Sequence, residues 1–326
     1  MNLKDLKNSN VLVSIFIDNL DKKEILEETL FSVSKQTSPI DLLVVHQLED
    51  SDLEELKTML DSPKITIRQT VDGKLEEQIT VSDGKINYIL QKVEFDEFPK
   101  LFNNVFNKAL ENGYELCSII EKFDIVGLNW FSLVNVYQAE NPDVHIFFPI
   151  IRNSLNGVFS NLMNEASWAE GLAEEAGKID LNLLNRFNCM VPLGAAFRVK
   201  SLEEFSEEGK NGQFLPIKES IKLSHYYEFF MRMIYNDLKA LCIPRIGYEY
   251  RVTTNDFFKQ YSCKVPTNLT EIKAENGGFA PQEAQFWMEL AKKEYFFDED
   301  RDKIYVAPVE IEAPMQAQEP TQDEQG

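Results

Sequence analysis

Two carboxylic acids stand close together directly after an apolar run. The run LCSII over 116–120 is followed by Glu121, Lys122, Phe123 and Asp124. Carboxylate oxygens are the ligands that hard cations such as Mg²⁺ prefer, so Glu121 and Asp124 could hold a metal ion. The same pattern suits the end of a strand followed by a helix cap, because aspartate caps helices well. Both interpretations stay open at the level of the sequence.

The histidines are the side chains that exchange protons near neutral pH. They are His46, His145 and His225, and no two have the spacing of a zinc site. Since the pKa of a free histidine is about 6.5, His225 could accept a proton. It could equally begin an aromatic-rich helix that packs on the sheet. His46 and Gln47 follow a buried run, where they could bind the edge of a base or form a loop.

Alternating strands and helices must position these residues. Continuous apolar runs over 11–17, 40–45, 114–120 and 144–151 predict strands buried on both faces, as in a parallel sheet. Strands are also expected over 64–70, 192–199 and 241–252, and helices over 18–36, 51–60, 98–112, 129–140, 224–240 and 281–297. We expect helix and loop over 153–188, and Trp130 to pack in the core rather than stack on a sugar.

Turn signals and composition predict additions to this domain. Asp-Gly pairs at 72–73 and 83–84 predict a β-hairpin inserted over 63–94. The C-terminal tail is acidic and rich in Pro and Gln, and it buries too little apolar surface to fold, so we expect it to be disordered. The expected divisions are an α/β domain over 1–255, a helical extension over 256–306 and the tail over 307–326.

The composition limits the partners. The chain has 54 acidic against 33 basic residues and a net charge of -21, so its surface repels nucleic-acid phosphates. No apolar run approaches the roughly 20 residues of a membrane span. Cys117 and Cys242 lie in apolar runs and are expected to be buried free thiols, which fits a reducing compartment such as the cytoplasm.

The order of these segments resembles the family 2 glycosyltransferases, which have the GT-A fold of nucleotide-diphospho-sugar transferases. The resemblance spans about residues 10–252. It implies a Rossmann-like α/β fold, with a mostly parallel central sheet flanked by helices. Four stretches carry it in order: VSIFIDNLDKKEILEETLFSVSKQTSPIDLLVV, FNNVFNKALENGYELCSIIEKFDIVGLNWF, PLGAAFRVKSLEEF and SHYYEFFMRMI.

The chain departs from the family where the resemblance implies chemistry. An aspartate that binds the nucleotide after the second strand is replaced by His46 and Gln47. The family's D-x-D motif holds a cation, Mg²⁺ or Mn²⁺, against the diphosphate of the donor. Here Glu121 and Asp124 are the candidate ligands, and Phe123 offers no oxygen to a cation.

The acceptor side is altered as well. His225 and Tyr226 stand where the family has its acidic base motif, which leaves His225 as the candidate base. Asn104 keeps the asparagine of the family's R-N motif and is the matching candidate on the nucleotide side.

Three hypotheses for the function follow from these departures. The first is a non-catalytic protein without a cofactor that binds protein partners in an assembly, for example in a virus or phage particle. The second is an active hexosyltransferase that uses Mg²⁺ or Mn²⁺ with a nucleotide sugar. The third is a carbohydrate-binding module whose partner is a glycan. We prefer the first, because the nucleotide, metal and acceptor positions have all changed.

Overall fold

The structure is a computed structural model. It describes residues 3, 7–71, 74–95, 98–155, 158–169, 175–180, 191–204, 206–209, 212–219 and 225–252. The helical extension and the acidic tail expected after residue 255 lie outside these residues. Among the described residues, no helix is both long enough and apolar enough to cross a bilayer.

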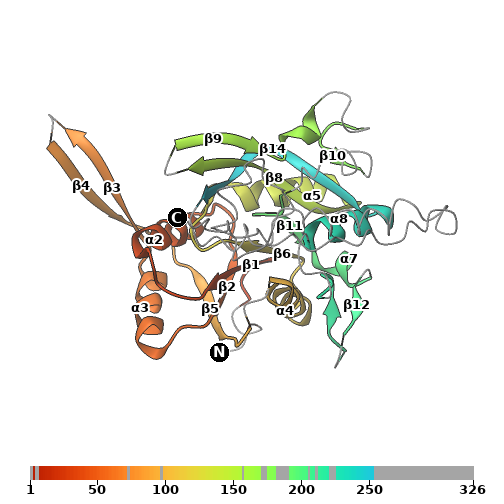
Figure 1. Ribbon diagram of the computed structural model, residues 1–326, viewed down its shortest axis with the longest axis horizontal. Helices are drawn as coiled ribbons and strands as arrows, with labels where there is room; N and C mark the ends of the chain where they lie inside the picture. The colour runs from red at the N-terminus through yellow and green to blue at the C-terminus, as the bar shows by residue number, and fades with distance from the viewer. Residues whose placement is uncertain are drawn as a thin grey trace, which may run out of the picture.

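A ten-stranded mixed sheet forms the centre of the molecule (Figure 1). Along the sheet the strand order is β10-β14-β8-β11-β6-β1-β2-β5, with β7 paired to β14 and β9 to β8. The strands are β1 (Val11–Ile17), β2 (Asp41–His46), β5 (Asn87–Lys92), β6 (Leu116–Ile120), β7 (Ile125–Val126), β8 (Val144–Leu155), β9 (Val158–Met163), β10 (Lys178–Ile179), β11 (Ala196–Arg198) and β14 (Lys239–Val252).

Most of the central strands run in one direction. The strands β5, β2, β1 and β6 are mutually parallel, and β8 and β14 are parallel to each other. The three-residue strand β11 lies antiparallel between β6 and β8 and joins the two parallel groups. As a result, the carboxyl ends of β1, β2, β6, β8 and β14 reach the same edge of the sheet.

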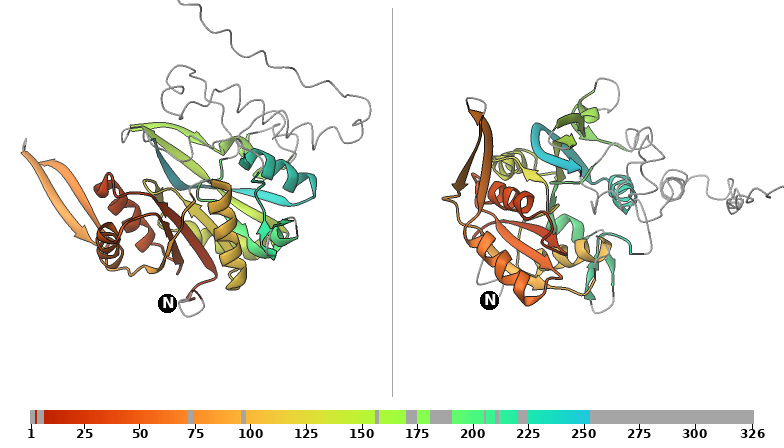
Figure 2. Two further views of the ribbon diagram at one scale, coloured as in Figure 1. Left: turned by 60° about the horizontal axis from the view of Figure 1, so that its bottom comes forward. Right: turned by 60° about the vertical axis from the view of Figure 1, so that its left-hand side comes forward.

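Helices cover both faces of the sheet, each over its own hydrophobic cluster (Figure 2). One face is covered by α2 (Lys23–Ser34), α3 (Asp50–Asp61) and α5 (Trp130–Glu140). The other is covered by α4 (Phe98–Glu111), α7 (Val199–Glu203) and α8 (His225–Tyr235). Smaller elements are the 3-10 helix η1 (Glu165–Trp168) and the paired strands β12 (Glu207–Glu208) and β13 (Phe214–Leu215).

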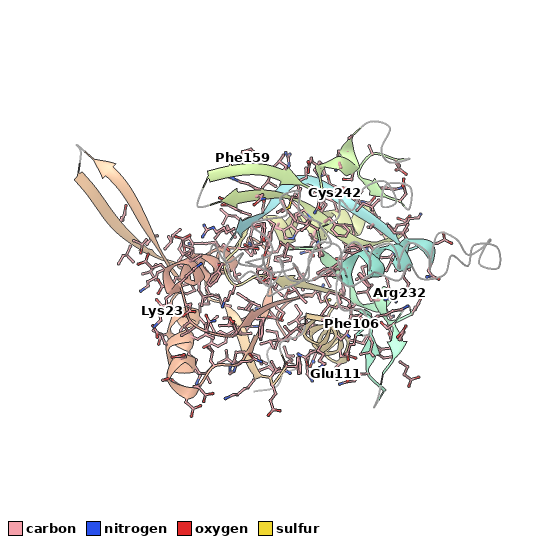
Figure 3. The ribbon with its side chains drawn as sticks, viewed as in Figure 1. Lys23, Phe106, Glu111, Phe159, Arg232 and Cys242 are labelled. Carbon is pink, nitrogen blue, oxygen red and sulfur yellow. The ribbon has the colours of Figure 1, made fainter. Side chains whose placement is uncertain are left out.

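The apolar stripe of α4 explains how this helix docks. Phe102 and Phe106 are fully buried, and the ring of Phe102 meets that of Phe197 edge-on at 5.2 Å. Figure 3 shows Phe106 within the body of the molecule and Glu111 at the outer end of the same helix. Residues of α4 that line the apolar stripe therefore fix the helix against the sheet.

The predicted α/β fold, with a mostly parallel central sheet flanked by helices, is confirmed. The added hairpin is also present, as β3 (Lys64–Val71) and β4 (Lys74–Val81). The hairpin is shorter than the insertion expected over 63–94. It ends with β4, because the next strand, β5, pairs with β2 and belongs to the central sheet. The helix expected over 224–240 ends at Tyr235, since Lys239 already belongs to β14.

One stretch was wrongly predicted in the part that the structure describes. Helix and loop were expected over 153–188, whereas β8 continues to Leu155 and the strands β9 and β10 follow. These strands form by pairing with β8 and β14, and their own sequences carry little strand signal. Residues 156–157, 170–174 and 181–188 lie outside the described residues. Cys117 and Cys242 are buried free thiols, as predicted.

Candidate functional site

The tetrapeptide of residues 121–124 leaves the sheet at the carboxyl end of β6. It lies next to the carboxyl end of β1, because the two strands pair in parallel with Ile15 opposite Ile120. The Lys122 ammonium forms an ion pair with Asp18, which directly follows β1, and donates to Asn19 Oδ1 at 3.1 Å. The predicted position of the tetrapeptide at this edge is therefore correct.

Phe123 belongs to the hydrophobic core. Its side chain is 6% exposed and sits in the cluster on the α2 and α5 face of the sheet. Two ammonium groups lie over its ring, Lys122 Nζ at 4.9 Å and Lys22 Nζ at 5.7 Å from the centroid. The position that carries a metal-binding acid in the family pattern therefore holds a buried ring beside positive charge.

Asp124 is fixed to β14. It is 1% exposed, and its Oδ1 accepts the backbone N–H of Arg251 at 2.8 Å. The Tyr248 hydroxyl accepts the N–H of Glu121 at 2.9 Å. Burial, with the nearby charges of Asp124 and Glu121, raises the pKa of the Tyr248 phenol well above its ordinary value. Asp124 thus joins the tetrapeptide to the last strand of the sheet.

Glu121 lies on the opposite face, toward α4. It borders a cavity of about 20 Å³ together with Ser14 and Phe16 of β1 and Leu101 and Val105 of α4. Pockets that bind drug-sized ligands have volumes of roughly 300–1,000 Å³. In the described residues, no three side chains of His, Cys, Asp or Glu gather as a metal site. Metal binding by Glu121 and Asp124 remains a prediction.

His46 ends β2 and is 3% exposed. Neighbouring side chains of a strand point to opposite faces of the sheet, and Val45 faces α4. The imidazole of His46 therefore faces the side covered by α2 and α3. Its Nδ1 is buried without a hydrogen-bond partner, and burial, followed by the charge of Lys92, lowers its pKa. Gln47 is half-buried, and its backbone N–H donates to Ile17.

Asn104 of α4 is engaged with the edge strand β5. Its carboxamide and that of Gln91 exchange two hydrogen bonds, at 3.1 and 3.3 Å. The neighbouring Asn103 bonds both backbone groups of Ile217, each at 3.0 Å. Asn107 holds Phe214 in the same way. The sequence did not single out Asn103 or Asn107 as residues that hold the 214–217 segment on α4.

The acceptor-side candidates lie on α8. His225 is its first residue, and the structure describes the backbone there but not the side chain. Tyr226 is buried and stacks on Phe230 at 5.8 Å. Arg232, labelled in Figure 3, donates to the carbonyl of Pro216 at 2.5 Å. The described side chains of α8 thus pack the fold, and the role of His225 remains a prediction.

Trp130 confirms the interpretation as a core residue. It is fully buried, and its indole N–H donates to the carbonyl of Gly194 at 2.7 Å. The sequence analysis missed two residues of β14, Tyr248 and Arg251. They contact the tetrapeptide from more than 120 residues further along the chain, so no local motif indicates these contacts.

The strand order and the two helical layers define an α/β fold with a mostly parallel central sheet. No family model matches the sequence, and no curated protein matches it either. Solved structures of S. aureus TarS are similar: one has a TM-score of 0.49 and 14% identity, with 92% of this chain and 46% of that chain covered. TarS 1-349 gives 0.48 and 15%, with 92% and 75% covered. The chain thus spans less than half of the longer TarS chain.

Proposed function

We propose that this chain is a glycosyltransferase-like protein that has lost sugar transfer and serves a binding or assembly role. The observation that carries the proposal is the position of the Asp124 carboxylate. Its side chain is 1% exposed, and its Oδ1 holds the backbone of β14 through the N–H of Arg251. A carboxylate buried against β14 in this way is not presented to a cation at the edge of the sheet.

The surroundings of the tetrapeptide support the same conclusion. A divalent cation needs oxygen ligands, and here the Lys122 ammonium and the ring of Phe123 stand between the two acids in the chain. Glu121 faces α4, whereas Asp124 contacts β14. These residues do not fit a cation that would neutralise a diphosphate leaving group, so we derive no catalytic step through one.

The nucleotide side supports it further. Asn104 is committed to Gln91, and His46 is turned toward the α2 and α3 side of the sheet. Neither presents a free polar group to the small cavity beside Glu121. A protein partner in an assembly therefore fits the chain better than a nucleotide sugar. We place that assembly in a reducing compartment, a cytoplasm or a particle built there, because the Cys117 and Cys242 thiols are free and buried.

The test is a thermal-shift and hydrolysis panel of nucleotide sugars with and without Mn²⁺. We expect no change in melting temperature and no released nucleotide with any donor. A ligand present at 100 times its Kd stabilises the fold by about 2.7 kcal/mol, so binding would be plain. A Mn²⁺-dependent shift that Glu121→Ala removes and Glu111→Ala leaves intact would overturn the proposal, because Glu111 is an exposed acid of α4.

A further inference from the structure

The paired strands β3 and β4, here called the β3–β4 arm, form a sheet of their own. Eight residues of each strand pair without a bulge, from Lys64 opposite Val81 to Val71 opposite Lys74. The arm stands clear of the body in Figure 1 and in both views of Figure 2. At about 3.4 Å per residue it is roughly 27 Å long.

The base of the arm is fixed to α2. Lys64 Nζ lies 3.1 Å from Glu27 Oε1, and the hydroxyls of Ser82 and Ser34 meet at 2.7 Å. The N–H of Ser82 donates to the carbonyl of Pro63 at 2.7 Å. A side chain at Gly84 would lie 2.1 Å from the Ser34 carbonyl oxygen, so backbone and helix touch there. These contacts set the direction in which the arm projects.

The arm leaves strand edges and apolar side chains open. In the part of the chain that the structure describes, neither β3 nor β4 has a second strand partner. Ile79 and Val81 point to one face of the arm and are 62% and 55% exposed. A lone two-stranded hairpin is marginally stable in water, and a regular open edge is a template for another strand. The arm has the form of a docking element.

The charges of the arm indicate which strand fits it. Residues 64–81 hold three basic and three acidic side chains, in a chain of net charge -21. Two copies therefore repel each other least where their arms meet. The strand β3 carries Lys64 and Arg68 and no acid, whereas β4 carries two acids, Glu76 and Glu77, against one base, Lys74.

The two strands of one arm already pair with each other. Arg68 stands opposite Glu77 in the ladder, and eight residues of each strand stay in register. The free edge of β3 therefore matches a second copy of β4 in both charge and strand pattern.

We propose that the β3–β4 arm is a self-association surface, in which the open edge of β3 receives β4 of a second copy of this chain. The inference names the partner for the binding or assembly role proposed above and rests on that role. The contact joins different edges of the two copies, so each copy keeps a free edge and growth need not stop at a dimer. One strand pair gives only about eight hydrogen bonds over roughly 27 Å, so the contact is weak and needs high concentration.

The experiment is sedimentation of the full chain from low to high micromolar concentration, at physiological and at raised salt. We expect the weight-average mass to rise with concentration and to pass that of a dimer, more so at raised salt, where repulsion between the acidic bodies is screened. Ile79→Lys adds a charge beside the basic β3 of the next copy and should leave a monomer. Val136→Lys, at a 49% exposed position of α5, is the matched control and should associate normally.

Hydrogen exchange supplies a second readout. Backbone amides of β3 and β4 should gain protection as the wild-type concentration rises, and those of α5 should not. A wild-type chain that stays monomeric throughout would overturn the inference, as would equal effects of the two substitutions. Neither result bears on the loss of sugar transfer, which the nucleotide panel tests separately.

Discussion

Replacing Asp124 with alanine should weaken the fold rather than remove a ligand site. The carboxylate is 1% exposed, and its Oδ1 receives the N–H of Arg251 at 2.8 Å. Alanine leaves this donor without its acceptor. Such a loss costs about 1–3 kcal/mol, and the free energy of unfolding should fall by that amount.

Urea unfolding measures this loss. With an m-value of about 3 kcal/mol/M, the midpoint should fall by roughly 0.3–1 M. Asp124→Asn keeps an oxygen for the Arg251 N–H and should cost less than alanine. Asp61→Ala is the matched control, because Asp61 accepts the Tyr88 hydroxyl at 2.9 Å on the surface. Its loss should cost less than about 1 kcal/mol.

One result would refute this reasoning. If Asp124→Ala unfolded at the wild-type midpoint and also abolished a Mn²⁺-dependent nucleotide interaction, the carboxylate would be a ligand. The structural role of Asp124 and the proposed loss of sugar transfer would then both be wrong. A large loss of stability without any nucleotide interaction in the wild type is the expected pattern.

Two further predictions concern a glycine and a histidine. Gly194 and Gly212 have φ angles of 68° and 71°, but a Cβ on Gly194 would lie 2.5 Å from the Tyr248 ring, whereas one on Gly212 meets nothing within 4 Å. Gly194→Ala should therefore cost about 1–3 kcal/mol more than Gly212→Ala in urea unfolding, and equal costs would contradict the packing argument. Burial lowers the pKa of His46, so the unfolded imidazole binds a proton first as pH falls below about 6.5. The stability that neutral His46 contributes is present above that pH and is lost below it. The substitution His46→Leu should therefore flatten the fall in unfolding free energy between about pH 7 and 5. If the unfolding free energies of variant and wild type fell in parallel with pH, this prediction would be wrong.

The central strands were predictable because burial on both faces leaves continuous apolar runs. Val11–Ile17 and Leu116–Ile120 read as such runs and form neighbouring strands. The strand β9 has the sequence VFSNLM, whose polar centre does not match the pattern of a strand. This segment forms a strand because it pairs with β8, and the pattern of one segment does not indicate its pairing partner.

The candidate site was predictable in place but not in detail. The apolar run before Glu121 indicated a strand end, and the tetrapeptide is found at the carboxyl end of β6. The destination of each side chain depends on distant segments. Asp124 meets Arg251 of β14, and Asn103 meets Ile217. Such contacts are set by tertiary packing, which spacing along the chain does not encode.

The short strand β11 has a consequence for synthesis on the ribosome. The outer edge of β6 is complete when residue 120 has emerged, yet the segment that covers it, Ala196–Arg198, comes about 75 residues later. At roughly 5–20 residues per second, that edge waits about 4–15 s for its cover. The nascent chain thus carries an uncapped parallel sheet through this interval, when chaperone protection would matter most.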